Sequence, residues 1–404
     1  MKYLVERDAQ NNMIMSFLLG EDGRAVEIHA DRESQALRVG DILIGRVEHV
    51  AENLRACFVE LEHGVKGYLP MEEIVEPVFT KKGPASFLQQ SDELVVQITR
   101  EAIGSKGVSL TTRLQLKGRY VILRRGTIGV GVSKKIDDPR RKMLKEELFS
   151  EQEIDELQQA AGPCGITLRT NAQSAPDEEI RAELSRLSEE MKHLLLTAPY
   201  RQLFCVMHRE PARWLTRMDS LQESRTDAII TDDEGLLREM NGRLKGAAAL
   251  SGKLRFYRNP QISMHALFGL TRELGQALSR KVEMKSGANL IIEQTEALAV
   301  IDVNSAHFIK GRQKEEAVLK VNLEAARECA RQIRLRNLSG MILIDFINME
   351  KEESDEMLMK TLREAVRQDP VHTQVIDRTG LGLIELTRRK EEAPLSVRMY
   401  QNNA

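Results

Sequence analysis

Cysteine is scarce and dispersed in this chain of 404 residues. Its four cysteines lie far apart, at Cys57, Cys164, Cys205 and Cys329, and the sequence contains no C-x-x-C pair. Neither a thiolate zinc site nor a dithiol redox motif is therefore indicated. We expect reduced, partly buried thiols in a cytoplasmic protein.

Long apolar runs and a net excess of charge are also missing. No run approaches the roughly 18 apolar residues that a bilayer span requires, and the N-terminus MKYLVERD carries charges where a signal peptide needs an apolar core. The 59 Lys and Arg residues nearly balance the 61 Asp and Glu residues. This balance argues against a protein that coats nucleic acid through bulk positive charge, but it leaves room for a local basic groove. The length predicts roughly two to four domains.

Aromatic residues make up only 4% of the chain, so those at patterned positions carry more weight. Five short apolar segments with Gly and Pro punctuation lie between Gly40 and Arg113, and they predict a small closed barrel. Phe58 and Tyr68 fall on two of these strands, with Lys106 and Arg113 nearby. Such a set would form the stacking and phosphate-binding face of an OB-fold barrel. Alternatively, Phe58 belongs to the barrel core and Tyr68 is half-buried packing.

Two segments outside the barrel predict a discontinuous domain. Strands are expected at 13–19 and 25–30, joined by the turn signal GEDG, and they are too few to make a core of their own. Later α/β material, with strands at 227–232 and 253–258, could complete their sheet. The barrel and the piece after it would then be inserted into this domain. A further helix is expected from 264 to 284.

The piece at 114–211 mixes strands and helices. Strands are expected at 119–124, 128–136 and 164–172, one charged amphipathic helix at 142–160, and a second long helix from about Pro176. Arg169 and Thr170 come at a strand end, where a forked cation, a hydroxyl and free backbone N–H groups can hold a terminal phosphate. Surface Arg-Thr pairs are common, so the alternative is that this pair binds no ligand.

The stretch 297–346 predicts a βαβ unit. An apolar run ends in Asp302, a helical pattern follows, and a second apolar run ends in Asp345. Neighbouring parallel strands would bring the two carboxylates together at their C-terminal ends, where open α/β sheets bind ligands. Oxygen ligands of this kind suit magnesium or manganese, and Asn304 lies on the same strand face as Asp302. The alternative is that each aspartate caps a helix or belongs to a turn.

The motifs resemble those of the ribonuclease E/G family over residues 10–392. The resemblance depends on SGANLIIEQTEALAVIDVNS, NLEAARECARQIRLRNLSGMILIDFI, GSKGVSLTT, GRYVIL and GVSKKI. It implies an α/β multidomain protein in which an RNase H-like domain is interrupted by an OB-fold barrel and an α+β 5′-sensor domain and is followed by a DNase I-like catalytic domain. The implied ranges are 1–36 and 212–275 for the RNase H-like parts, 37–117 for the barrel, 118–211 for the sensor and 276–404 for the catalytic domain.

The resemblance also implies roles for single residues. Asp302 and Asp345 match the aspartates that bind the catalytic magnesium, and Asn304 matches the asparagine that orients one of them. Arg169 and Thr170 match the pocket for a 5′-monophosphate. A separate pair, Phe58 and Tyr68, matches the aromatic positions of the RNA-binding barrel, with Lys106 nearby.

Three departures from the family pattern change these expectations. No cysteine follows the segment 387–390 before Ala404, so we expect neither a structural zinc, nor a zinc-linked dimer, nor the family's small C-terminal domain. Asn348 replaces a usual aspartate, and we expect activity to survive. A basic residue of the 5′-phosphate pocket aligns near His372, which is only partly charged at neutral pH and would sense the 5′ end weakly.

These observations predict a magnesium-dependent endoribonuclease that cleaves single-stranded RNA and leaves 5′-phosphate and 3′-hydroxyl ends. A metal held by Asp302 and Asp345 would activate water and stabilise the transition state. On family grounds its role would be in rRNA processing or mRNA decay. One alternative is a catalytically weak or inactive RNA-binding protein of the same fold. Another is an α/β magnesium phosphatase, which leaves the barrel without a role.

Overall fold

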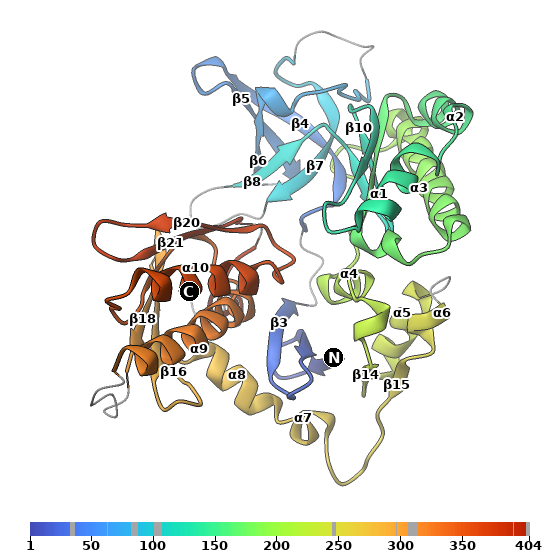
Figure 1. Ribbon diagram of the computed structural model, residues 1–404. Coiled ribbons are helices and arrows are strands. Elements are labelled where there is room, and N and C mark those ends of the chain that lie inside the picture. Colours follow the sequence, from blue (N-terminus) through green and yellow to red (C-terminus); the bar gives the residue numbers. More distant parts are fainter. Residues whose placement is uncertain are drawn as a thin grey trace. The chain divides into compact units, whose positions relative to one another are not determined.

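The computed structural model of the chain divides into two compact units, one of them discontinuous in sequence (Figure 1). Unit 1 comprises Met1–Glu33 and Glu223–Ala404, and unit 2 comprises Ser34–Gln222. Unit 2 thus interrupts unit 1 in the sequence. The structure describes residues 1–32, 37–62, 64–81, 88–100, 107–244, 248–295, 297–305, 314–390 and 392–400.

The first sheet of unit 1 joins the two sequence segments of that unit. Its strands, in spatial order, are β15 (Leu254–Phe256), β14 (Ala228–Thr231), β1 (Lys2–Asp8), β2 (Met13–Leu19) and β3 (Ala25–Arg32). The three N-terminal strands are antiparallel, while β1 pairs in parallel with β14, and β14 with β15. The later segment thus completes the N-terminal sheet, as expected, although β1 itself was not predicted.

The second sheet of unit 1 contains the βαβ unit. Its strands, in spatial order, are β16 (Lys281–Glu283), β17 (Asn289–Gln294), β18 (Leu298–Asn304), β19 (Gly340–Asp345), β21 (Ile384–Arg388) and β20 (Thr373–Arg378). The neighbours β18 and β19 are parallel, and α9 (Lys314–Leu335) connects them. Alternate strand residues such as Ile301 and Ile344 are fully buried and pack with α9 and α10 (Glu352–Val366) in one apolar core. The opposite face of the sheet carries the residues between them.

The prediction of one continuous helix from 264 to 284 is wrong. The chain forms α7 (Met264–Leu267) and α8 (Leu270–Leu278), and then it enters strand β16. Gly269 separates the helices with a φ of 62°, a left-handed conformation that glycine adopts without strain. Apolar periodicity alone does not reveal such a break.

The barrel of unit 2 has the predicted five strands and closes on itself. They are β4 (Ile42–Ala51), β5 (Ala56–Glu62), β6 (Val65–Pro70), β7 (Glu93–Arg100) and β8 (Val108–Thr111). The pairing order is β4, β5, β6, β8, β7 and back to β4, with β6 and β8 parallel. This arrangement is consistent with an OB fold. A short strand, β13 (Val206–His208), adds to the edge of β4.

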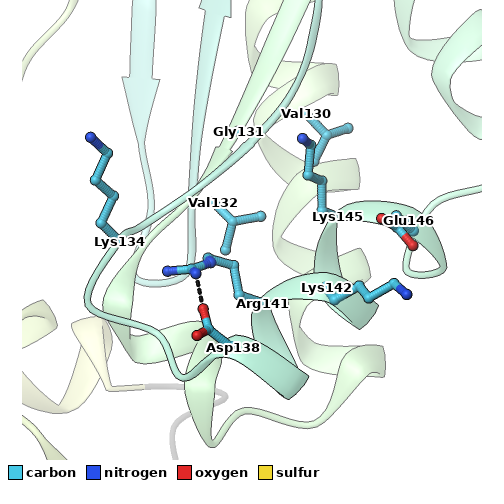
Figure 2. A pocket seen from close by; sticks show the side chains of 9 residues that line it. All are labelled: Val130, Gly131, Val132, Lys134, Asp138, Arg141, Lys142, Lys145 and Glu146. Carbon is cyan, nitrogen blue, oxygen red and sulfur yellow. Dashed lines mark ion pairs between the residues drawn. The ribbon is translucent and has the colours of Figure 1, made fainter.

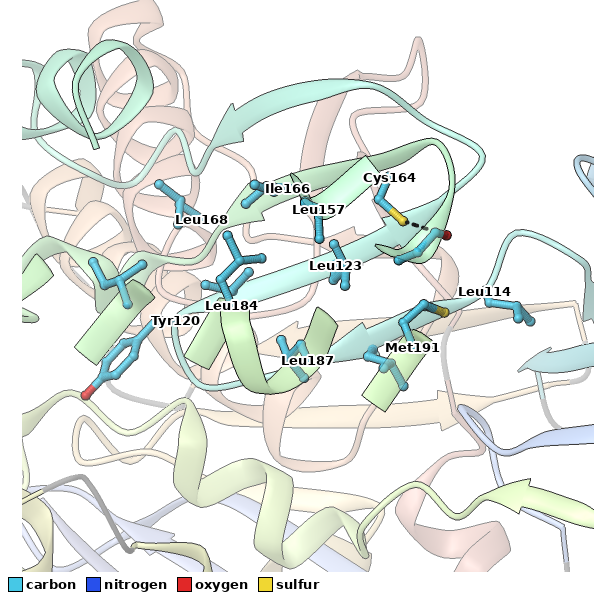
Figure 3. Close-up of a cluster of buried hydrophobic side chains, with 14 of the residues drawn as sticks. Leu114, Tyr120, Leu123, Leu157, Cys164, Ile166, Leu168, Leu184, Leu187 and Met191 are labelled. Atoms are coloured by element: carbon cyan, nitrogen blue, oxygen red, sulfur yellow. Dashed lines mark hydrogen bonds between the residues drawn. The ribbon is translucent and has the colours of Figure 1, made fainter. Parts of the chain in front are cut away.

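The second part of unit 2 is a four-stranded sheet covered by helices. Its strands, in spatial order, are β11 (Gly129–Val132), β12 (Cys164–Leu168), β10 (Val121–Arg125) and β9 (Gln115–Lys117). Leu184, Leu187 and Met191 of α3 (Asp177–Thr197) pack against Leu123 and Ile166 of the sheet (Figure 3). This core fixes the sheet and leaves its edge strand β11 paired only with β12 among the described residues.

The single helix predicted at 142–160 is in fact two helices, α1 (Asp138–Glu146) and α2 (Glu151–Ala161). Ser150 begins the second one with a capping box, in which its side chain accepts from the backbone N–H of Glu153 and the Glu153 carboxylate accepts from the backbone N–H of Ser150. A serine at this spacing is a strong helix start, and that start was overlooked within a continuous charged pattern.

The remaining elements are short. They are η1 (Glu52–Leu54), η2 (Met71–Glu73), η3 (Thr170–Gln173), η4 (Ala198–Tyr200), α4 (Arg213–Asp219), η5 (Glu223–Arg225), α5 (Glu234–Arg243), α6 (Ala248–Ser251) and α11 (Leu395–Tyr400). Among the described residues, no helix has the length and apolar character needed to cross a membrane. Three of the four free thiols, those of Cys57, Cys164 and Cys329, are buried.

Candidate active site and nucleic-acid-binding surfaces

The two aspartates of the βαβ unit are direct neighbours. In the parallel register of β18 and β19, Asp302 lies opposite Asp345, just as Ile301 lies opposite Ile344. Neighbouring strands lie about 4.8 Å apart, and residues at the same register point to the same face. Both carboxylates are thus on the sheet face that α9 and α10 leave open, where Asp302 is half-buried and Asp345 is exposed.

Asn304 lies beside this pair and contacts one member. Its side-chain Nδ2 donates a hydrogen bond of 2.7 Å to Oδ2 of Asp302. The contact follows from the two-residue period of a strand, which places both side chains on one face. It holds the Asp302 carboxylate in one orientation and leaves its other oxygen for a ligand.

The interpretation of these aspartates as helix caps finds no support in the described contacts. In the part of the chain that the structure describes, neither carboxylate accepts a hydrogen bond from a helix N-terminus. The N-cap of α10 is Lys351. The open face also carries Glu385 of β21, which lies opposite Leu343, two positions before Asp345. Glu385 is absent from the predicted site, although the alternation of residues 384–388 places it on this face.

The donor set fits a hard divalent cation. Magnesium is commonly held by one or two carboxylates, with waters and substrate phosphates completing an octahedron of oxygen ligands. Asp302 and Asp345 offer the carboxylates, and their positions opposite each other on neighbouring strands allow both to ligate one cation. Among the described residues there is no group of three or more His, Cys, Asp or Glu side chains arranged to hold a metal. A site of two carboxylates suits a cation that keeps much of its hydration.

Phe58 and Tyr68 form a pair on the barrel. They lie opposite each other on the antiparallel strands β5 and β6, with ring centroids 6.0 Å apart and an interplanar angle of 68°. Their neighbours Val59 and Leu69 are fully buried in the barrel interior, whereas both rings are half-buried. Phe58 is therefore not part of the barrel core, and its ring offers area on which a base could stack.

Two basic side chains were predicted beside these rings, and the structure describes only one of them. Lys106 lies outside the described residues. Arg113 follows β8, where its guanidinium donates to the carbonyl of Glu72 at 2.8 Å and lies 3.8 Å from the Glu73 carboxylate. Arg113 is thus already engaged with the segment after β6, and its contact with RNA stays a prediction.

Arg169 and Thr170 lie where β12 ends and the short helix η3 begins. The Arg169 guanidinium donates to the carbonyl of Gly118, and the hydroxyl groups of Thr170 and Ser133 lie 3.0 Å apart. Both residues are half-buried. His372 belongs to unit 1 and is exposed just ahead of β20, and its part in a phosphate pocket stays a prediction.

The sequence of the chain is similar to those of known proteins of one family. Residues 115–391 match the model of the ribonuclease E/G family. Ribonuclease G of Escherichia coli K12 is 30% identical over 384 residues, which cover 92% of this chain and 76% of that protein. Ribonuclease G of Haemophilus influenzae is 30% identical over 93% of this chain and 77% of its own length, and ribonuclease E of Nostoc sp. is 30% identical over 88% of this chain and 51% of its own. The chain belongs to the ribonuclease E/G family.

Proposed function

We propose that this chain cleaves single-stranded RNA with a magnesium or manganese ion held by Asp302 and Asp345. Membership in the ribonuclease E/G family makes it an endoribonuclease, a hydrolase that acts on phosphodiester bonds. The observation that carries the metal assignment is the register pairing of the two aspartates, with Asn304 bonded to one of them. The donors of the pair are oxygen atoms only, and this supports a hydrated cation and a phosphate ligand.

The chain's own residues have separable tasks in this reaction. Asp302 and Asp345 would hold the cation on the open sheet face, and Asn304 fixes the orientation of Asp302. Phe58 and Tyr68 bind substrate bases on the barrel. A bound divalent cation supplies Lewis acidity for water activation and neutralises charge that develops on the phosphate. Attack by water leaves a 5′-phosphate on one product and a 3′-hydroxyl on the other.

The finer architecture is part of the same proposal. We assign the sheet β15-β14-β1-β2-β3 to an RNase H-like domain, the closed barrel to an OB fold, the sheet of β9–β12 to a 5′-sensor domain and the βαβ sheet to a DNase I-like catalytic domain. Arg169 and Thr170 would bind a 5′-monophosphate in the sensor. On family grounds, we propose that the protein acts in rRNA processing or mRNA decay in the cytoplasm.

The proposal is tested by incubating a 5′-monophosphorylated single-stranded RNA with the wild-type chain, Asp302→Asn and Asp345→Asn, with magnesium and with a chelator. The expected result is cleavage by the wild type, only with the metal, and no cleavage by either of these two variants. Asp377→Asn is the matched control, because Asp377 is an exposed carboxylate of the same sheet, on β20. Equal cleavage by Asp302→Asn and wild type would exclude the metal role of Asp302.

A different outcome would favour an RNA-binding protein without catalysis. The aromatic pair on the barrel does not depend on the carboxylates, so RNA binding can persist where cleavage does not. RNA binding without cleavage in any divalent metal would support that alternative. Analysis of the product ends separates attack by water from cleavage that leaves a 2′,3′-cyclic phosphate. Finding the cyclic phosphate would contradict attack by water.

A further inference from the structure

A basic groove lies in unit 2, between the edge strand β11 and the helix α1 (Figure 2). Its volume is about 670 Å³, and its lining is Val130, Gly131, Val132, Lys134, Asp138, Arg141, Lys142, Lys145 and Glu146. None of the site residues of the proposed function belongs to this lining.

One face of α1 makes the wall of the groove. The lining residues of α1 are spaced three and four apart, a spacing that aligns side chains along one helix face. They are residues 138, 141, 142, 145 and 146. The opposite face packs into the core through Leu144. The helix cannot rotate without exposing that leucine, so the charged face is held toward the strand.

The charge of the groove is predominantly positive and mostly uncompensated. Asp138 forms an ion pair with Arg141, one turn along α1. Lys134, Lys142 and Lys145 are exposed, and none of them has a carboxylate partner in the part of the chain that the structure describes. Glu146 is the one remaining acid of the lining. Three lysine ammonium groups held around one cavity favour an anionic ligand with several charges.

The floor of the groove suits a nucleotide strand. Val130 and Val132 are half-buried, and the exposed Gly131 between them carries no side chain that would keep a ligand away from the backbone. Figure 2 shows Lys145 reaching from α1 toward Val130, while Lys134 stands at the other side. Apolar surface next to point charges can contact bases and phosphates together.

The lining of the groove lies one residue from a contact with Thr170. Ser133 directly follows Val132, its backbone N–H donates to the carbonyl of Leu168, and its hydroxyl lies 3.0 Å from that of Thr170. We infer that the groove between β11 and α1 binds the backbone phosphates of the nucleotides that follow an RNA 5′ end held at Thr170. This inference rests on the proposed function, because it takes single-stranded RNA as the substrate.

The test measures binding of a 3′-fluorescein-labelled, 5′-monophosphorylated single-stranded RNA to the full chain in a chelator, so that no cleavage is needed. Lys142→Ala/Lys145→Ala should weaken binding about 5-fold for each lost phosphate contact at 0.1 M salt, and the slope of log K against log[salt] should fall by about 0.7 per contact. Alanine favours the helix, and a thermal melt checks that the variant is folded.

Arg186→Ala/Lys192→Ala is the matched control, because it removes the same charge from exposed positions of α3 in the same unit. It should leave the salt slope unchanged. A groove variant that binds RNA with the wild-type affinity and slope would overturn the inference. An equal loss of affinity for polyglutamate would also overturn it, since the groove would then be a general anion surface.

A second measurement tests where the strand lies. An RNA with 4-thiouridine near its 5′ end should crosslink to the peptide 134–146 of the wild-type chain, and the same label near the 3′ end should not. Crosslinks that ignore the position of the label would contradict the inference. Failure of the proposed catalysis would appear in the cleavage assay of Asp302→Asn, whereas these binding measurements would be unaffected.

Discussion

At the scale of single residues, the proposed metal site depends on the hydrogen bond from Asn304 to Asp302. Outer partners that orient a metal ligand typically contribute about 10- to 100-fold to metal affinity or activity. Asn304→Ala should therefore raise the magnesium concentration for half-maximal cleavage by about that factor. Because Asn304 is exposed, the thermal stability of the chain should not change. Magnesium titrations of cleavage rate measure the effect.

Asn348 provides the comparison for Asn304. It lies three residues beyond Asp345 and is also exposed. Asn348→Ala should keep the wild-type magnesium requirement, because no metal or carboxylate contact is assigned to this side chain. An equal rise in both variants would mean that the amide of Asn304 has no special role.

The aromatic pair on the barrel gives a second prediction at this scale. Stacking of a base on an aromatic side chain contributes about 1–3 kcal/mol to single-strand binding. Phe58→Ala and Tyr68→Ala should each weaken RNA binding by roughly that amount, as measured by fluorescence anisotropy in a chelator. Phe79→Ala should act differently, because Phe79 is buried in the barrel core and its loss lowers stability. RNA binding unchanged in both surface variants would exclude stacking on this face.

At the scale of elements, His208 connects the edge strand β13 to the helix α3. Its Nδ1 lies 2.7 Å from the Glu190 carboxylate of α3, and its Nε2 lies 3.7 Å from that of Glu210. Burial lowers the pKa of His208, but the hydrogen bonds to the two carboxylates outweigh it and raise the pKa from 6.5 to about 9. Arg186 also approaches Glu190, at 3.5 Å, and competes for its charge.

The raised pKa of His208 predicts a stability that falls in alkaline solution. Since the folded-state pKa lies above the unfolded one, the stabilisation is complete below about pH 6.5 and is lost as the pH rises through about 9. Its magnitude is on the order of 3 kcal/mol. Urea unfolding at several pH values should show this loss in the wild type and not in His208→Gln. His372→Gln, which changes an exposed histidine, should keep the wild-type profile.

At the scale of the whole molecule, ion pairs tie the two sheets of unit 1 into one body. Glu27 of β3 accepts a hydrogen bond of 2.5 Å from Nε of Arg334 on α9, and their side chains are only 4% and 16% exposed. On the same helix, Glu328 accepts from Arg24 at 3.1 Å. The first strands of the chain are therefore held by a helix some 300 residues later, which explains why residues 1–33 belong to the same compact unit.

Breaking this connection should destabilise unit 1 alone. Arg334→Ala leaves the buried Glu27 carboxylate without its main partner, which typically costs about 3–5 kcal/mol. Scanning calorimetry should show the transition of unit 1 shifted down by roughly 10 °C, with the transition of unit 2 unchanged. Arg280→Ala is the control, because its pair with Glu293 is exposed and should contribute under about 1 kcal/mol. A single transition that shifts as a whole would show that the two units unfold together.

Much of the fold and part of the site could be predicted from local patterns. The barrel strands, the βαβ unit and the strand-end positions of Asp302, Asp345 and Arg169 follow from apolar periodicity and punctuation, which depend on near neighbours in the sequence. The breaks at Gly269 and Ser150 were missed, because a continuous amphipathic pattern hides a change of backbone conformation. Glu385 was missed because its position beside Leu343 results from a long-range strand pairing.

The sequence by itself determined which residues can do chemistry: two strand-end aspartates with an asparagine two positions away, an aromatic pair on a barrel, and motifs of one ribonuclease family. Only the tertiary structure decided which of them meet. The register of β18 and β19 places Asp302 opposite Asp345, and that of β5 and β6 places Phe58 opposite Tyr68. The groove of β11 and α1 likewise exists only after α1 packs its leucine face into the core. The physical reason is that a strand's own period fixes the face of a side chain, while pairing and packing between distant segments fix its neighbours.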